Sequence, residues 1–199
     1  MTNKSVVTAL AALAIVALAS FAVAALRPDK PAFDATDVTG VAWGRDFQLR
    51  GHDGKRHELA DFRGKVVALY FGYTRCPDVC PTTMAALGQA ARLLGRDAER
   101  LQGLFLTVDP QHDKPAVLAR YVASFNESFI GLYGDAQATR RTAREFKVES
   151  GRDHSAPVFV FDPGGRLRLI LRPNATPQSI ARDIRLLLLA DSARARAVD

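Results

Sequence analysis

The chain has 199 residues and a formal net charge of +6 at pH 7, from 27 lysines and arginines against 21 aspartates and glutamates. The arginines are scattered in short groups, and no basic run alternates with aromatic residues, so the sequence gives no support to nucleic-acid binding. We therefore expect no nucleic-acid partner, and interpret most of the charged groups as solvated surface.

The first part of the chain differs in composition from the rest. Residues 6–26 carry no charged side chain, and Lys4 precedes them. About 20 apolar residues are enough to cross the hydrocarbon core of a bilayer, so length favours an uncleaved membrane anchor. A cleavable signal peptide is the alternative, because Ala22–Ala24 resembles a small-residue cleavage site. We expect residues 1–26 to be an anchor or a signal sequence, and under either interpretation the remainder of the chain is exported.

Beyond this segment we expect a linker, one domain and a short tail. Residues 27–45 hold two prolines and two glycines with little periodicity, which is typical of a linker. We expect the domain over residues 46–190, a length sufficient for a proper core, and a C-terminal tail over residues 191–199.

The domain begins with a predicted hairpin and a buried strand. Asp53 and Gly54 separate two short alternating runs within residues 47–59, which indicates a hairpin. Residues 66–71 are almost wholly apolar and rich in β formers, as in a strand buried on both faces. The remaining predicted elements are helices over 82–95, 114–125, 136–146 and 177–189, with strands over 104–108, 158–162 and 167–171.

Strands that alternate with helices imply a central sheet covered on both faces. The antiparallel pair near the end of the chain makes that sheet mixed. We therefore predict an α/β fold of the thioredoxin-like kind, a central mixed β-sheet flanked by helices, with an N-terminal β-hairpin extension.

The strongest local feature is the pair Cys76 and Cys80, the only cysteines of the chain. They lie between a predicted buried strand and a predicted helix, where open α/β sheets place their sites. The N-terminus of a helix favours a thiolate, and two thiolates form a soft ligand pair suited to copper or zinc. A structural disulfide and a redox-active pair are the alternatives in an oxidising compartment.

A metal held by two sulfurs needs a further ligand, and the chain offers four histidines. His52 and His57 fall in the predicted hairpin, where we expect surface residues. His112 comes after the strand that ends at residue 108 and could face the site. His154 lies immediately before the strand at residue 158, in the loop that faces the dithiol of a thioredoxin-like fold. We favour His154 as the ligand and keep His112 as its rival.

Three segments together resemble the Sco/SenC family of copper chaperones. They are Phe71–Met84, which contains the cysteine pair, Val108–Pro110, and Asp153–Gly165. The resemblance implies a thioredoxin-like domain that binds copper, as Cu(I) or Cu(II), through Cys76, Cys80 and His154.

The resemblance also implies a cellular role. Family members help to assemble the dinuclear copper (CuA) centre of cytochrome c oxidase, so the expected partner is subunit II of that oxidase or another copper-receiving protein. The expected location is the membrane, with the soluble domain outside the cytoplasm, on the periplasmic side of a bacterial inner membrane. The chain departs from the family after Val108–Pro110, where the family often has an arginine and a threonine and this chain has neither in Gln111–Pro115. This difference leaves the role of the loop open.

Two other functions fit the same thiols. A thiol–disulfide oxidoreductase would use Cys76 to attack client disulfides, with Cys80 as its partner. A peroxide-reducing enzyme is the third hypothesis and ranks lowest, because His154 has no necessary place in it. Asp78 and Asp153 could orient metal ligands or serve as helix caps or solvent-exposed groups.

Overall fold

The structure is a computed structural model that describes residues 32–148, 157–172 and 174–196. The residues from Phe33 onward form one compact unit. Within the described residues, no helix is both long and apolar enough to cross a membrane. The segment 6–26, expected as an anchor or signal, lies outside them.

Among the described residues, eight strands form a single mixed sheet in the order β1-β8-β7-β4-β5-β6-β2-β3. The strands are β1 (Thr36–Asp37), β2 (Gln48–Gly51), β3 (Arg56–Glu58), β4 (Val66–Gly72), β5 (Leu101–Thr107), β6 (Ile130–Tyr133), β7 (Val158–Phe161) and β8 (Leu167–Ile170). β4, β5 and β6 run parallel, and all other neighbours pair antiparallel. The predicted mixed sheet is therefore confirmed.

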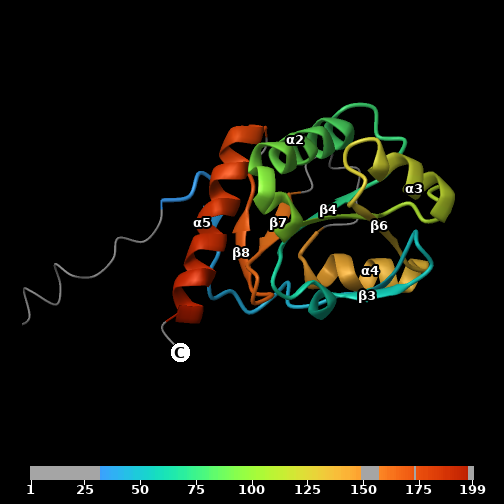
Figure 1. Ribbon diagram of the computed structural model, residues 1–199. Helices are drawn as coiled ribbons and strands as arrows, with labels where there is room; N and C mark the ends of the chain where they lie inside the picture. Colours follow the sequence, from blue (N-terminus) through green and yellow to red (C-terminus); the bar gives the residue numbers. More distant parts are fainter. Residues whose placement is uncertain (1–31, 149–156, 173, 197–199) are drawn as a thin grey trace, which may run out of the picture. The chain divides into compact units, whose positions relative to one another are not determined.

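Helices cover both faces of this sheet. The α-helices are α2 (Val79–Leu94), α3 (Pro115–Ala123), α4 (Ala136–Glu145) and α5 (Pro177–Arg196), and η1 (Leu59–Phe62) and η2 (Gly95–Arg100) are 3-10 helices. Buried side chains of α2, α3 and α5 share one hydrophobic cluster, while those at α4 belong to a second cluster on the other face (Figure 1). Apolar residues at helical spacing in α2 and fully buried, mainly apolar strands in the centre explain this two-sided core.

β6 has no counterpart among the predicted strands. It is only four residues long and contains Gly131, both of which weaken a sequence-based signal for a strand. A Cβ atom at Gly131 would lie 2.9 Å from the Cβ of Leu118, so the glycine allows α3 to approach the sheet closely. β6 also joins the predicted hairpin of β2 and β3 to the parallel strands.

Part of the expected linker packs against the domain. The backbone N–H of Ala35 donates to Asp183 Oδ2 at 2.8 Å, and Thr36 pairs with Ile170 in the sheet. Trp43 meets the ring of Phe159 edge-on, with 6.1 Å between the centroids. The structure thus differs from the expected linker over residues 33–45. The proline- and glycine-rich composition does not reveal this packing, because the packing depends on backbone pairing and on one aromatic contact.

The last helix is longer than its apolar pattern predicts. α5 continues to Arg196, through most of the segment expected as a tail. Arg100 pairs with Asp191 at 3.3 Å, and the Ser192 hydroxyl donates to the Leu188 carbonyl at 3.0 Å. Polar contacts therefore support the last turns, which a search for apolar periodicity does not detect.

Candidate copper site

The cysteine pair lies at the carboxyl end of β4, between that strand and α2. Gly72 ends the strand, and its carbonyl accepts a hydrogen bond from the Val108 N–H at 2.8 Å. A Cβ atom at Gly72 would lie 3.0 Å from Cys80 Sγ and 2.8 Å from the Phe105 ring. The absence of a side chain at residue 72 therefore makes room for the Cys80 sulfur beside the sheet.

The two thiols are adjacent and mostly shielded from solvent. The backbone N–H of Cys80 donates to Cys76 Sγ, with 3.4 Å between nitrogen and sulfur. Cys76 is 5% exposed and Cys80 is 3% exposed, and both are free thiols. Because α2 begins at Val79, Cys76 lies outside the helix and its sulfur accepts from a first-turn N–H, as a capping side chain does. The two sulfurs are therefore adjacent because Cys76 precedes the helix and Cys80 lies in its first turn, and not because both lie on one face of the helix.

The surroundings favour a thiolate at Cys76. Burial raises the pKa of this thiol, but hydrogen bonds from the Cys80 thiol, from the backbone N–H groups of Cys80 and Asp78, and from the Tyr73 hydroxyl outweigh it, and the net effect lowers the pKa. Donors that stabilise an anion act in this direction.

Cys80 behaves in the opposite way. Deeper burial raises its pKa to about 11, although the Tyr70 hydroxyl, at 3.5 Å from the sulfur, partly offsets this. Its hydrogen bond to the Cys76 sulfur also favours the protonated form. The pair therefore combines a thiol whose pKa is lowered, Cys76, with one whose pKa is raised, Cys80.

This asymmetry predicts selective alkylation. Only the thiolate reacts, so iodoacetamide at pH 7.5 is expected to modify Cys76 well before Cys80, with Cys80 joining as the pH approaches 11. Tandem mass spectrometry of the peptide that contains both residues measures the order. Equal modification of the two thiols at pH 7.5, or earlier modification of Cys80, would contradict the assignment.

Asp113 fastens the loop that precedes Cys76. Its side chain accepts hydrogen bonds from the Thr74 backbone N–H (3.0 Å), the Thr74 hydroxyl (2.5 Å) and the Thr107 hydroxyl (2.6 Å). Asp113 is 1% exposed. The sequence pattern predicts it as a cap for the helix of residues 114–125, yet the N-cap of α3 is Lys114 and it has no side-chain cap. Asp113 instead ties the thiol loop to the end of β5.

The histidines are distributed differently from expectation. His154, the favoured metal ligand, lies outside the described residues. His112 is half exposed, and its Nδ1 lies 2.9 Å from Asp109 Oδ1. This hydrogen bond and a further one from Arg75 hold the pKa of Asp109 below its usual range, against the effect of burial. Among the described residues, no three Cys, His, Asp or Glu side chains form a metal-binding group, so His112 does not join the thiol pair there.

The other two histidines have structural contacts. His52 Nδ1 accepts from the Gly131 N–H at 3.0 Å. The prediction that His57 lies at the surface is wrong, because this residue is 9% exposed, stacks on Phe62 and bonds to Asp53 at 3.1 Å. The alternation of the hairpin places residue 57 on the buried face, opposite Leu49.

Asp78, one of the two aspartates proposed as orienting groups, does not act as a side-chain cap. Asp78 occupies the N-cap position of α2 without a side-chain cap, and it accepts a 3.4 Å hydrogen bond from the Thr82 hydroxyl. It contributes to the site through its backbone N–H, toward Cys76. Asp153 lies outside the described residues.

Comparison with known proteins gives a consistent result. The SCO1/SenC family model matches residues 36–189. The mitochondrial SCO2 homologue of Danio rerio is 37% identical over 139 residues, which are 63% of this chain and 50% of that protein. The chain thus spans about half the length of this relative.

Solved structures agree with the sequence comparison. Apo Sco1 from Thermus thermophilus has a TM-score of 0.67 at 37% identity, covering 81% of this chain and 99% of that one. Copper-bound ScoI from Bradyrhizobium japonicum has a TM-score of 0.64 at 31% identity, covering 72% and 98% respectively.

The fold and the site define a thioredoxin-like domain with a thiol pair between strand and helix. With the family match over most of its length, the chain belongs to the SCO1/SenC family. Its fold prediction and its family resemblance are confirmed.

Proposed function

We propose that this chain is a copper metallochaperone that carries one copper ion on Cys76 and Cys80, with His154 as third ligand, and delivers it to the CuA centre of cytochrome c oxidase. The single observation that carries the proposal is the pair of adjacent cysteine side chains at the start of α2. A related structure of the same family contains bound copper.

The chemistry of the donors suits a metal that must be handed on. Two thiolates are soft ligands that favour Cu(I), and a neutral imidazole also tolerates Cu(II). The site lies at the carboxyl end of β4, where the chain leaves the sheet to enter α2, so thiols of a receiving protein can replace the donors one at a time. Copper is here the cargo, and Cys76, Cys80 and His154 are its temporary ligands.

The proposal extends to location. We infer that residues 6–26 anchor the chain and that the domain faces the compartment outside the cytoplasm, on the periplasmic side of a bacterial inner membrane. Subunit II of the oxidase, or another copper-receiving protein, is the proposed partner.

A titration of the reduced, full-length chain with Cu(I), in competition with a coloured chelator, tests the ligand set. We expect one copper per chain, and at least about tenfold weaker binding in His154→Ala because one of three donors is lost. The matched control is His112→Ala, which should bind like the wild type. Unchanged binding in His154→Ala, or weaker binding in His112→Ala alone, would contradict the ligand assignment.

The unequal thiols also favour a second function, thiol–disulfide exchange with a client protein. The Cys76 thiolate would attack one sulfur of a client disulfide and form a mixed disulfide, releasing a client thiolate. Cys80 would then attack Cys76 Sγ, give up its proton, and leave the client reduced and this pair oxidised. Stoichiometric reduction of a disulfide peptide by the metal-free chain, absent in Cys76→Ser, is the expected result if the chain has this function.

A further inference from the structure

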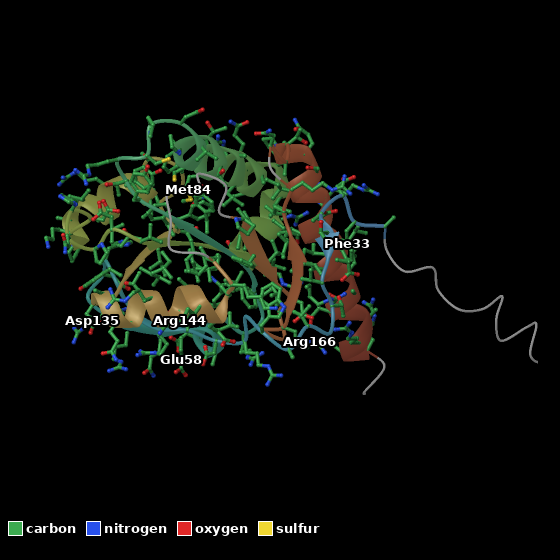
Figure 2. All side chains as sticks on the ribbon, turned by 180° about the vertical axis from the view of Figure 1, so that it is seen from behind. Phe33, Glu58, Met84, Asp135, Arg144 and Arg166 are labelled. Carbon is green, nitrogen blue, oxygen red and sulfur yellow. The ribbon has the colours of Figure 1, made fainter. Side chains whose placement is uncertain are left out.

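A basic hollow of about 530 Å³ lies where β6 ends and α4 begins, at the end of the sheet where β4 also ends. It is lined by Arg50 of β2, Arg56 of β3 and Arg141 of α4, together with Tyr133 and Asp135. In Figure 2 the label Asp135 marks the start of α4, where this hollow lies. No other acidic side chain lines it.

The strand register explains both the hollow and its position. β2 pairs with β6 only as far as Arg50 opposite Tyr133, because the chain then leaves the sheet to enter α4. Leu106 of β5 pairs with Leu132, and Gly72 of β4 pairs with Thr107, so the ends of β4, β5 and β6 lie at one level. Adjacent strands are about 4.8 Å apart, so the hollow lies roughly two strands along the sheet from the end of β4. The cysteine pair and α4 belong to hydrophobic clusters on opposite faces of the sheet.

The positions of the arginines lower the stability of the fold. Arg50 and Arg56 are directly opposite each other in the β2–β3 hairpin, and like charges in that arrangement are destabilising. Arg56 donates to Gln48 Oε1 at 2.7 Å, but the guanidinium groups of Arg50 and Arg141 have no hydrogen bond or ion pair with any described residue. The carboxylate of Asp135 is already engaged, since it caps α4 through the Ala138 N–H at 2.7 Å.

We propose that this hollow, defined by Arg50, Arg56 and Arg141, docks an acidic segment of the protein with which the chain exchanges copper. Guanidinium groups bind carboxylates in a planar, two-point geometry, and three of them from three elements match a run of acidic side chains. The volume exceeds that of a single small anion, and Tyr133 with Ala138 adds an apolar wall for a polypeptide. This inference rests on the proposed function for the identity of the partner, but not for the presence of the acidic segment.

Docking here would place the partner at the end of the sheet where β4 leads into the loop of Cys76. Opposite charges also accelerate the encounter, and salt weakens that effect. The hollow thereby confers selectivity for acidic partners without touching the metal.

The test uses the reduced, full-length chain and a fluorescein-labelled hexaglutamate peptide, followed by fluorescence anisotropy at 20 and 200 mM salt. The wild type is expected to bind the peptide at low salt, and Arg50→Gln/Arg141→Gln about tenfold more weakly. The matched control is Arg92→Gln/Arg96→Gln, which removes the same charge at the far end of α2 and should bind like the wild type.

Several outcomes would overturn the proposal. The first is that Arg50→Gln/Arg141→Gln binds the peptide as tightly as the wild type does. The second is that both double variants lose the same amount of peptide affinity. The third is that the wild type binds anionic lipid vesicles or inorganic phosphate but does not bind the peptide. Copper titration of the same variants separates this proposal from the proposed function. Unchanged copper binding with lost peptide binding supports docking, whereas absent copper binding in the wild type overturns only the chaperone role.

Discussion

Cys76→Ser and Cys80→Ser are each expected to weaken Cu(I) binding by at least about a hundredfold. Binding free energies of roughly 10–16 kcal/mol in four-ligand metal sites correspond to about 3 kcal/mol per donor, or two orders of magnitude. A serine hydroxyl is a hard, neutral donor that does not replace a thiolate for Cu(I). Competition titration of each variant against a coloured chelator measures the loss.

The fold should tolerate these two changes. A hydroxyl at residue 80 can still accept from Tyr70, and at residue 76 it can still accept from the Cys80 N–H. Far-UV circular dichroism should therefore match the wild type. Met84→Leu is the sulfur-removing control, because Met84 is buried in the same cluster and leucine fills a similar volume. Copper affinity that stays within about threefold of wild type in Cys80→Ser would contradict the site.

Asp113→Ala is expected to lower the free energy of unfolding by about 3 kcal/mol. The change removes three hydrogen bonds, each worth about 1 kcal/mol or more, and leaves the buried Thr107 hydroxyl and the Thr74 N–H without their acceptor. Denaturant unfolding followed by circular dichroism measures the difference. The freed loop should also weaken copper binding, because it carries Cys76.

Asp113→Asn is the matched control for this variant. An amide retains one oxygen acceptor for the Thr74 N–H and the Thr107 hydroxyl, and its NH₂ group can donate to the Thr74 hydroxyl. It should lie much closer to the wild type in both measurements. Unfolding of Asp113→Ala at the same denaturant concentration as the wild type would show that Asp113 does not fasten the loop.

The sequence predicted those parts of the fold whose signal is local. Residues 66–71 form an uninterrupted apolar run, and residues 82–94 repeat apolar side chains at helical spacing, so β4 and most of α2 were expected. β1 and β6 were not, since a two-residue strand and a four-residue strand with a central glycine pair through the backbone. Pairing of this kind depends on distant partners that no local pattern reveals.

For the site, too, the sequence predicted the features that have a local signal and missed those that depend on tertiary contacts. Cys76 and Cys80 were found from their spacing and their place between strand and helix. The difference between the pKa values of their thiols was not, because it arises from the deeper burial of Cys80 and from the hydrogen bonds that Cys76 accepts, including one from the Tyr73 hydroxyl. Asp113 precedes a lysine and a proline at a helix start, which imitates a cap, and only tertiary contacts show its bond to Thr74.

The arginines of the basic hollow come from two strands and a helix that are distant in sequence. Arg141 belongs to a short basic group that is typical of solvated surface, and Arg50 and Arg56 flank an ordinary hairpin turn. Their convergence requires β6, the strand that the sequence did not predict, because the end of β6 creates the hollow.

X-ray absorption spectroscopy of the full-length chain loaded with one equivalent of Cu(I) tests the central claim most directly. The copper edge and fine structure should show two sulfur donors and one nitrogen donor, with the nitrogen lost in His154→Ala and one sulfur lost in Cys80→Ser. A spectrum with no sulfur donor, or one that is identical in the wild type and the Cys80→Ser variant, would contradict a copper site built on Cys76 and Cys80.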